Sequence, residues 1–210
     1  FWRSEDFGRT WSQAMSGLNN DGSLFYISYD MDPFEPANLY LGTYRMYKTT
    51  DGGRLWTMPN SCLFPSESGG CYYISAVSVS TADPRYVFAG ANSGAVAVSS
   101  NAGGAWTVYS SGLPVAYCSS VRSFEANIVY ATYSRYGVDK VWRSSDYGAT
   151  WTSINGDLPE VPVNDIMRID GKLIIGTDVG PFISEDEGTI WQRLGSGIPS
   201  VVVYRLRYSE

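Results

Sequence analysis

An eight-residue phrase recurs five times along the 210-residue chain and constrains its fold more than any other feature. The pattern is Ser/Thr-x-Asp-x-Gly-x-x-Trp, and it is clearest in SSDYGATW at residues 144–151. The other copies are SEDFGRTW at 4–11, TTDGGRLW at 49–56, SSNAGGAW at 99–106 and SEDEGTIW at 184–191. Their closing tryptophans follow one another at intervals of 45, 50, 45 and 40 residues. A repeat of this period between strand-like segments indicates an array of small β-sheets.

The residue types of the phrase suit a turn between two strands. The aspartate can accept hydrogen bonds from backbone N–H groups one or two residues further on, and the asparagine of the third copy can do the same. The glycine adopts positive φ without a Cβ clash, and the tryptophan opens the next strand with a large apolar surface for packing between sheets. We therefore predict a structural role for Asp6, Gly8, Trp11, Asp51, Gly53, Trp56, Asn101, Gly103, Trp106, Asp146, Gly148, Trp151, Asp186, Gly188 and Trp191.

The phrase resembles the Asp-box (BNR) repeat of sialidase-like and VPS10-like propellers, and the five copies extend the resemblance over nearly the whole chain. It implies an all-β fold, a β-propeller of four-stranded antiparallel blades whose Asp boxes are the turns between the third and fourth strands. The same repeat occurs in xyloglucan-degrading hydrolases and in photosystem II assembly propellers. Because the class contains enzymes, receptors and assembly factors, the resemblance does not select a function.

Each repeat reads as four strands, A to D. The first complete set is predicted at residues 24–29, 39–42, 46–49 and 55–58, and three further sets follow. Residues 1–11 supply only strands C and D, and residues 201–208 supply only one more strand A. We therefore expect one propeller domain over residues 1–210, with four complete blades and an incomplete one. It either closes as a five-bladed ring or forms an arc of a larger propeller, which we favour. An arc needs the remaining blades of a longer chain, or a partner subunit, to cover its bare faces.

Composition excludes several kinds of chemistry. The net charge of −6, without a basic patch, argues against nucleic acid as a partner. The chain has no histidine, which removes Ser-His-Asp and Cys-His catalysis and the commonest zinc ligand. We therefore expect no metal site and no cofactor, and we assign no catalytic residue. No apolar run is long enough to span a membrane.

Three cysteines bear on the compartment of the protein. Cys62 and Cys71 flank the short polar loop LFPSESGG, and a disulfide between them would leave Cys118 free. The alternative is three reduced, buried thiols. Because the loop is polar and proteins of this class are often exported, we expect the disulfide and a secreted or cell-surface location.

Strand order predicts where a ligand binds. In an up-and-down meander the A–B and C–D turns share one edge, with the Asp boxes, and the B–C and D–A loops share the other. The loops of the second edge differ between repeats: they include a B–C loop at 133–139 and D–A loops at 59–71, 110–118 and 155–162. Variable loops on a rigid scaffold often carry binding sites, and tyrosine and arginine suit sugars and peptides. The candidate binding residues are Tyr44, Arg45, Tyr117, Tyr133, Arg135 and Tyr136.

Evidence for an enzyme is weak in the sequence. Glycoside hydrolysis needs two carboxylates about 5–10 Å apart, or a tyrosine nucleophile with a carboxylate helper. The acidic candidates outside the boxes form no recognisable pair: Asp30, Glu35, Glu67, Asp139, Asp165 and Asp170. The Arg-Ile-Pro motif of sialidases is absent. We predict a non-catalytic extracellular binding or scaffold module that recognises a protein or a carbohydrate. The alternative is a glycoside hydrolase of the Asp-box class, or a fragment of one.

Overall fold

The structure is a computed structural model that describes residues 1–58, 62–125, 127–195 and 197–208. These residues form strands and loops only, so the all-β prediction is confirmed. No helix long and apolar enough to cross a membrane occurs in the described ranges. The strands make five antiparallel sheets, and within each sheet consecutive strands of the chain are neighbours.

The sheets follow one another along the chain. The first pairs β1 (Trp2–Arg3) with β2 (Ser12–Gln13). The second contains β3 (Ser28–Met31), β4 (Leu39–Gly42) and β5 (Met46–Thr49). The third contains β6 (Ile74–Val79), β7 (Val87–Ala91), β8 (Val96–Ser99) and β9 (Thr107–Tyr109). The fourth contains β10 (Cys118–Ser123), β11 (Val129–Tyr133), β12 (Val141–Ser144) and β13 (Thr152–Ser153). The fifth contains β14 (Val163–Ile169), β15 (Lys172–Thr177), β16 (Gly180–Ser184) and β17 (Gln192–Arg193).

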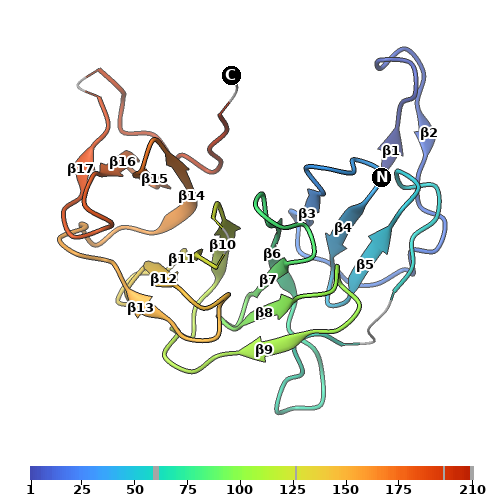
Figure 1. The fold of residues 1–210 in the computed structure, drawn as a ribbon, viewed down its shortest axis with the longest axis horizontal. Coiled ribbons are helices and arrows are strands. Elements are labelled where there is room, and N and C mark those ends of the chain that lie inside the picture. The colour runs from blue at the N-terminus through green and yellow to red at the C-terminus, as the bar shows by residue number, and fades with distance from the viewer. Residues whose placement is uncertain (59–61, 126, 196, 209–210) are drawn as a thin grey trace.

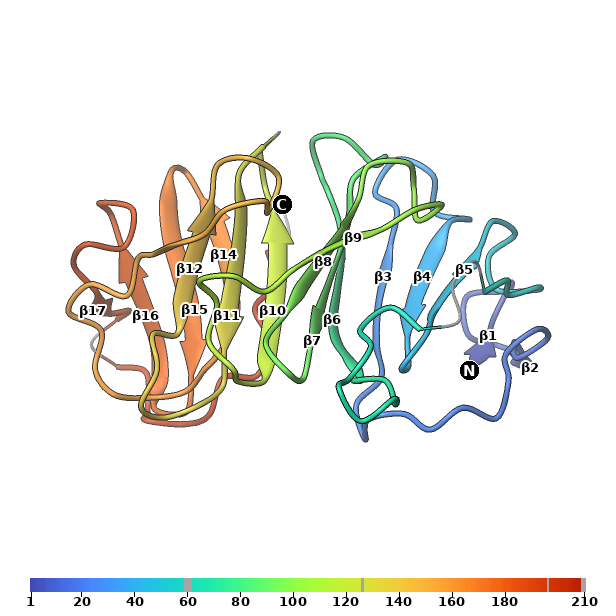
Figure 2. The same ribbon diagram turned by 90° about the horizontal axis from the view of Figure 1, so that it is seen from below.

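The sheets are arranged as blades around an open arc (Figure 1). Strands β3, β6, β10 and β14 are the inner strands of their blades, and the strands run between two opposite edges of the arc (Figure 2). The sheet of β1 and β2 and the sheet ending in β17 lie at opposite ends and do not meet (Figure 1). Of the two arrangements that the sequence allowed, the structure therefore has the arc and not the closed five-bladed ring.

The hydrophobic core is divided into clusters that lie between neighbouring blades. One cluster joins Tyr40 and Met46 of the first complete blade to Val77 and Val87 of the next. Equivalent clusters join the second blade to the third and the third to the fourth. Each blade is thus stabilised by burying its apolar faces against its neighbours.

Glycines at one register position let successive inner strands approach closely. Gly42, Gly90 and Gly176 occupy the same place in β4, β7 and β15, opposite the inner strand of their own blade. A Cβ atom would lie 2.4 Å from Ile74 Cγ2 at the first glycine and 2.4 Å from Cys118 Sγ at the second. At the third it would lie 2.7 Å from the backbone oxygen of Val203. Ile74 and Cys118 belong to the inner strands that follow, and Val203 belongs to the segment that follows the last blade.

Residues 201–208 continue this pattern although they form no regular strand, contrary to the prediction. The Val203 N–H donates to the Thr177 oxygen at 2.9 Å, as the Ile74 N–H donates to the Thr43 oxygen at 2.7 Å in the second blade. The segment therefore lies where the inner strand of another blade would lie. It forms no ladder because no strand B pairs with it among the described residues.

Two further strand predictions were wrong. Residues 24–27 do not join strand A, which begins at Ser28; Phe25 and Tyr26 are instead exposed in the preceding loop. The predicted strand at 55–58 is reduced to one bridge, between Lys48 and Thr57, so the first of the four blades predicted to be complete has a three-stranded sheet.

The five Asp boxes share one hydrogen-bonded geometry. At residues 144–151, Ser144 Oγ donates to Asp146 Oδ1 at 2.7 Å and accepts from the Gly148 N–H at 2.8 Å. Asp146 Oδ1 also accepts from the Thr150 N–H at 2.8 Å. The carboxylate thus receives an N–H four residues further on, and not one or two as predicted. The residue before the glycine also has positive φ: 59° at Tyr147, against 91° at Gly148.

The box tryptophans differ in burial along the arc. Trp56 and Trp191 are buried, and their indole N–H groups donate to carbonyls of the preceding blade, Ala14 O at 3.1 Å and Ile154 O at 3.2 Å. These two side chains therefore connect neighbouring blades. Trp11, at the end of the arc, is exposed and donates to Gly8 O in its own turn.

Acidification is expected to destabilise the fold through these turns. Hydrogen bonds lower the pKa of Asp6, Asp51, Asp146 and Asp186. The main donor is the N–H of the seventh box residue, except at Asp146, where it is the Thr150 hydroxyl. A carboxyl with a lower pKa in the folded state stabilises the fold above its unfolded pKa, and this contribution is lost as the pH falls through the folded pKa. We expect thermal melts to show a falling midpoint below about pH 4.

A variant with asparagine at these four positions tests the assignment. Asn101 already shows that an amide fits, because its Oδ1 accepts the Ala105 N–H at 2.7 Å. The variant should fold and lose less of its melting temperature on acidification than the wild-type chain. An equal loss in both chains would mean that other groups control the acid response.

Candidate functional site

The B–C and D–A loops meet at one edge of the arc. In the third blade, the Ser134 N–H donates to the Tyr117 oxygen at 3.0 Å. Ser134 follows strand B, and Tyr117 lies in the loop before strand A. In the second blade, the Asn92 N–H donates in the same way to the Tyr73 oxygen. At the opposite edge the box turns contact the A–B turns, as where the Tyr147 N–H donates to the Asn127 oxygen at 3.0 Å. The two edges are therefore composed as strand order predicts, and we call the B–C and D–A side the loop edge. Residues 59–61 of the predicted D–A loop 59–71 lie outside the described residues.

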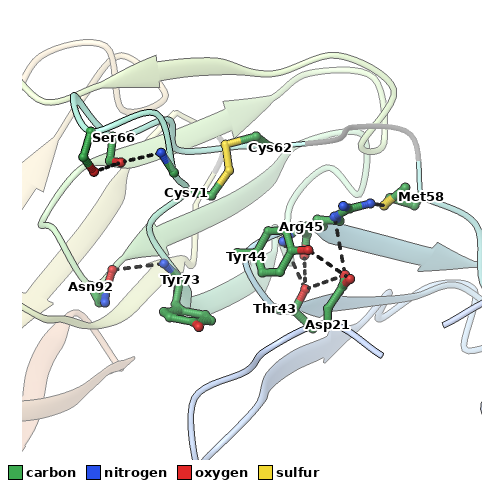
Figure 3. Close-up of a disulfide and its surroundings, with 12 residues drawn as sticks. Asp21, Thr43, Tyr44, Arg45, Met58, Cys62, Ser66, Cys71, Tyr73 and Asn92 are labelled. Atoms are coloured by element: carbon green, nitrogen blue, oxygen red, sulfur yellow. Dashed lines mark hydrogen bonds and ion pairs between the residues drawn. A yellow bond between two sulfur atoms is a disulfide. The ribbon is translucent and has the colours of Figure 1, made fainter. Parts of the chain in front are cut away.

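Asp21 organises the loop edge of the first complete blade (Figure 3). Its carboxylate accepts hydrogen bonds from the hydroxyls of Tyr44 at 3.2 Å and Thr43 at 3.4 Å, and also from Tyr47. Arg45 Nε lies 3.6 Å from Asp21 Oδ2, and the Arg45 guanidinium carbon lies 5.0 Å from the centre of the Tyr44 ring. The Asp21 side chain is only 5% exposed. This carboxylate therefore holds both candidate residues of the B–C loop in fixed positions.

More aromatic side chains stand at the same edge than the sequence suggested. The Tyr44 and Tyr73 rings meet edge to face, with centres 6.3 Å apart. Phe25 and Tyr26, in the loop before β3, are both largely exposed. They were missed because the run LFYISY has the composition of a strand, and only the absence of a partner strand at residues 24–27 shows it to be a loop.

The long B–C loop of the third blade is held by its neighbours. The Arg135 guanidinium donates to the Val115 oxygen at 2.6 Å, across to the D–A loop. Glu160 accepts from the Gly137 N–H and from the buried Lys140 ammonium, and the Lys140 bond is the main cause of a lowered Glu160 pKa. Tyr136 projects from this loop and is 62% exposed. It is the most exposed of the four candidate tyrosines.

The two remaining tyrosine candidates have different environments. Tyr117 is 37% exposed and immediately precedes the third blade's inner strand. Tyr133 is fully buried at the end of β11, where burial raises its pKa and its hydroxyl donates to the Gly94 oxygen at 2.8 Å. Tyr133 was predicted to lie in the B–C loop, and this was wrong: the residue belongs to strand B, and its side chain is buried.

The acidic candidates do not gather at the loop edge. Asp30 in β3 and Asp165 in β14 both approach Arg122 of β10, with oxygen–nitrogen distances of 3.9 and 3.6 Å. The strands that carry them, β3, β10 and β14, lie on the inside of the arc (Figure 1). Glu35, Glu67, Asp139 and Asp170 lie in turns and loops and share no ion pair with them. Asp165 is fully buried and accepts from Ser120 Oγ at 2.7 Å and from the Ile166 N–H at 3.0 Å. Its hydrogen bonds are typical of a structural carboxylate.

A disulfide lies beside the loop edge (Figure 3). It joins Cys62 to Cys71, with the Cα atoms 6.0 Å apart. Between them, Leu63 and Phe64 are buried in the cluster that joins the first and second complete blades. Cys118 is a free thiol, fully buried in β10. Burial raises the pKa of this thiol to about 12, so it remains protonated and unreactive at neutral pH.

Comparisons with known proteins agree with this architecture. The chain matches the family described as BNR-Asp box repeat over residues 1–14 and 141–154. No curated protein is detectably similar in sequence. Among solved structures, the GH74 xyloglucanase from Xanthomonas campestris superposes with a TM-score of 0.72 at 15% identity, covering 94% of this chain and 34% of that one. The GH74 enzyme of Niastella koreensis gives 0.62 at 18% identity, covering 79% and 29%.

A smaller propeller is also similar. YCF48 bound to a D1 peptide superposes with a TM-score of 0.57 at 14% identity, covering 82% of this chain and 60% of that one. The chain spans about a third of the length of the GH74 structures that it matches. At these identities the likeness shows the fold alone. With five box turns of one geometry and blades in an open arc, the chain carries Asp-box repeats and has the fold of part of a β-propeller.

Proposed function

We propose that the chain is a non-catalytic binding module that recognises a protein or carbohydrate ligand through its loop edge. The observation that carries this proposal is the set of accessible aromatic side chains held there beside arginines. Tyr44 and Arg45 are fixed by Asp21, Arg135 is fixed by Val115, and Tyr136 and Tyr117 are exposed. Rigid aromatic rings give a large contact area with little loss of entropy, and arginine adds directed donors. The box turns have nearly the same structure in every blade, so they offer little to distinguish ligands.

An extracellular location is part of the proposal. The Cys62–Cys71 disulfide supports it, because such bonds persist mainly in oxidising compartments. The solved propellers are consistent with either ligand class: one is a xyloglucanase, and another is bound to a peptide.

The alternative is a glycoside hydrolase or a fragment of one, and the superposition on GH74 structures favours it. One observation argues against a hydrolase: Asp165, one of the acidic candidates, is buried and accepts three hydrogen bonds from groups of the fold. Xyloglucan serves as the probe for both readings: a binding module retains it intact, whereas a hydrolase releases new reducing ends.

Replacing exposed aromatics tests the edge. Binding of xyloglucan and of an array of synthetic peptides is measured for the wild-type chain, Tyr117→Ala and Tyr136→Ala. We expect one ligand class to bind and both variants to weaken it at least tenfold, about 1.4 kcal/mol. Phe7→Ala is the matched control, since Phe7 is a fully exposed aromatic in a box turn on the opposite edge. Loss of binding only in Phe7→Ala would place the site on the edge of the box turns and contradict the proposal. Release of reducing ends from xyloglucan would establish the hydrolase.

A further inference from the structure

A cavity of about 280 Å³ lies inside the arc, away from the loop edge. Its lining comes from the inner strands and from the A–B turns, which include Pro33, Thr81 and Phe124. Residues 206–208 close one side, because the Leu206 N–H donates to Asp165 Oδ2 at 3.0 Å and holds this segment against β14. The segment's position inside the arc is visible in Figure 1. Ligand cavities for drug-sized molecules usually measure about 300–1,000 Å³, so this one suits a smaller molecule.

Two arginines in this cavity share one buried carboxylate. Arg122 Nε lies 3.6 Å from Asp165 Oδ1, and Arg207 Nη1 lies 3.8 Å from Asp165 Oδ2. These separations exceed a hydrogen-bond distance. Asp165 oxygens already accept from one hydroxyl and two backbone N–H groups. Asp165 therefore compensates the arginines by its charge and accepts no hydrogen bond from either guanidinium. Arg207 Nη1 instead donates to the Leu206 oxygen at 2.9 Å, so Arg122 is the arginine that can donate to a ligand.

Arg122 and Asp30 together offer a donor and an acceptor to a ligand. The Arg122 side chain is 15% exposed, and in the described part of the chain its guanidinium makes ion pairs but no hydrogen bond. Asp30 Oδ2 accepts from the Val79 N–H at 2.9 Å, whereas Oδ1 has no hydrogen-bond donor among the described residues. Asp30 Oδ2 lies 3.9 Å from Arg122 Nη1. A cationic donor group and an anionic acceptor thus stand side by side at the cavity.

The rest of the lining is mainly apolar. It includes the residues Met31, Val79, Phe124, Ile166, Met167 and Tyr208. A ligand that satisfies this cavity needs one negative group for Arg122, one positive group for Asp30 and an apolar body. A ligand with only one charged group would complement either Arg122 or Asp30 and leave the charge of the other side chain without a partner from the ligand.

We propose that this cavity binds a free apolar α-amino acid. The α-carboxylate accepts hydrogen bonds from the Arg122 guanidinium, the α-ammonium donates to Asp30, and the side chain contacts the apolar lining. Guanidinium and carboxylate match one another in shape and charge. The site lies apart from the loop edge, so it stands whether or not that edge binds a ligand.

Calorimetric titration of the wild-type chain with three small probes tests the proposal. L-Phenylalanine carries both charged groups, 3-phenylpropanoate lacks the ammonium and 2-phenylethylamine lacks the carboxylate. We expect saturable binding of phenylalanine, and at least tenfold weaker binding of each analogue. Absence of saturable heat with phenylalanine up to about 10 mM, or equal binding of all three probes, would overturn it.

Two variants assign the charges. Arg122→Gln should remove the preference for phenylalanine over phenylethylamine, and Asp30→Asn the preference over phenylpropanoate. Arg85→Gln is the matched control: Arg85 is an exposed arginine paired with Asp83 in an A–B turn outside the cavity, and its loss should change nothing. If folded Arg122→Gln keeps the full preference, the assignment is wrong. If this variant fails to fold, the three probes on the wild-type chain still decide.

Discussion

Replacing Tyr133 with alanine is expected to lower the free energy of unfolding by about 3–5 kcal/mol. The side chain is fully buried between the second and third complete blades, in the same cluster as Phe88 and Val121. Truncation therefore removes an aromatic ring from a packed core and leaves the Gly94 oxygen without its hydroxyl donor. Tyr133→Phe keeps the ring and should cost only about 1 kcal/mol.

Urea denaturation measures these differences, and the chain supplies a matched control three residues further on. Tyr136 is the same residue type but exposed, so Tyr136→Ala should change stability by no more than about 0.5 kcal/mol. Equal losses in Tyr133→Ala and Tyr136→Ala would contradict the burial of Tyr133 and restore it as a binding candidate.

Removing the disulfide is expected to have the next largest effect. Closing a loop between residues nine positions apart restricts the unfolded chain, and opening it should cost about 2–3 kcal/mol. The loop also carries Leu63 and Phe64 into the core between two blades, so greater freedom of the loop weakens that contact as well. We expect Cys62→Ala/Cys71→Ala to unfold at a lower urea concentration than the wild-type chain.

Dithiothreitol provides the control for this prediction. It should lower the stability of the wild-type chain toward that of the double variant and leave the variant unchanged. An unchanged wild-type midpoint after verified reduction would show that the bond adds nothing to stability. Cys118 does not complicate the comparison, because its thiol is buried and protonated.

The sequence was most informative where structure depends on neighbouring residues. The Asp-box turns need only eight consecutive residues, so their spacing predicted a succession of small sheets. The strands predicted at 39–42 and 46–49 agree with the bounds of β4 and β5. Strand order then separated the two edges. Local pattern could not place Tyr133, because its burial depends on Gly94 in the preceding blade. It also could not show that residues 201–208 have no partner strand in the described part of the chain.

The proximity of Asp30, Arg122 and Asp165 could not be predicted either, because it depends on contacts between blades. Asp30, Arg122 and Asp165 belong to three different blades, and no local motif joins them. A signal was nevertheless available: Asp30 pairs with Tyr40 and Arg122 with Tyr130, at the same register position of their blades. An alignment of the repeats on strand A places these two opposite charges at the same position of their strands, on the inside of the arc. Asp21, in a loop without a repeat equivalent, offered no such signal.

The glycines of the second strands have a consequence for how such a chain changes in evolution. Each of these blades presents a recess at its glycine, and the next inner segment supplies the atoms that fill it, as Ile74, Cys118 and Val203 do at Gly42, Gly90 and Gly176. A gene duplication that copies a whole repeat therefore copies both halves of the contact. Propellers of this kind can gain or lose units without redesigning a junction, whereas a duplication out of phase with the repeat would leave a recess unfilled.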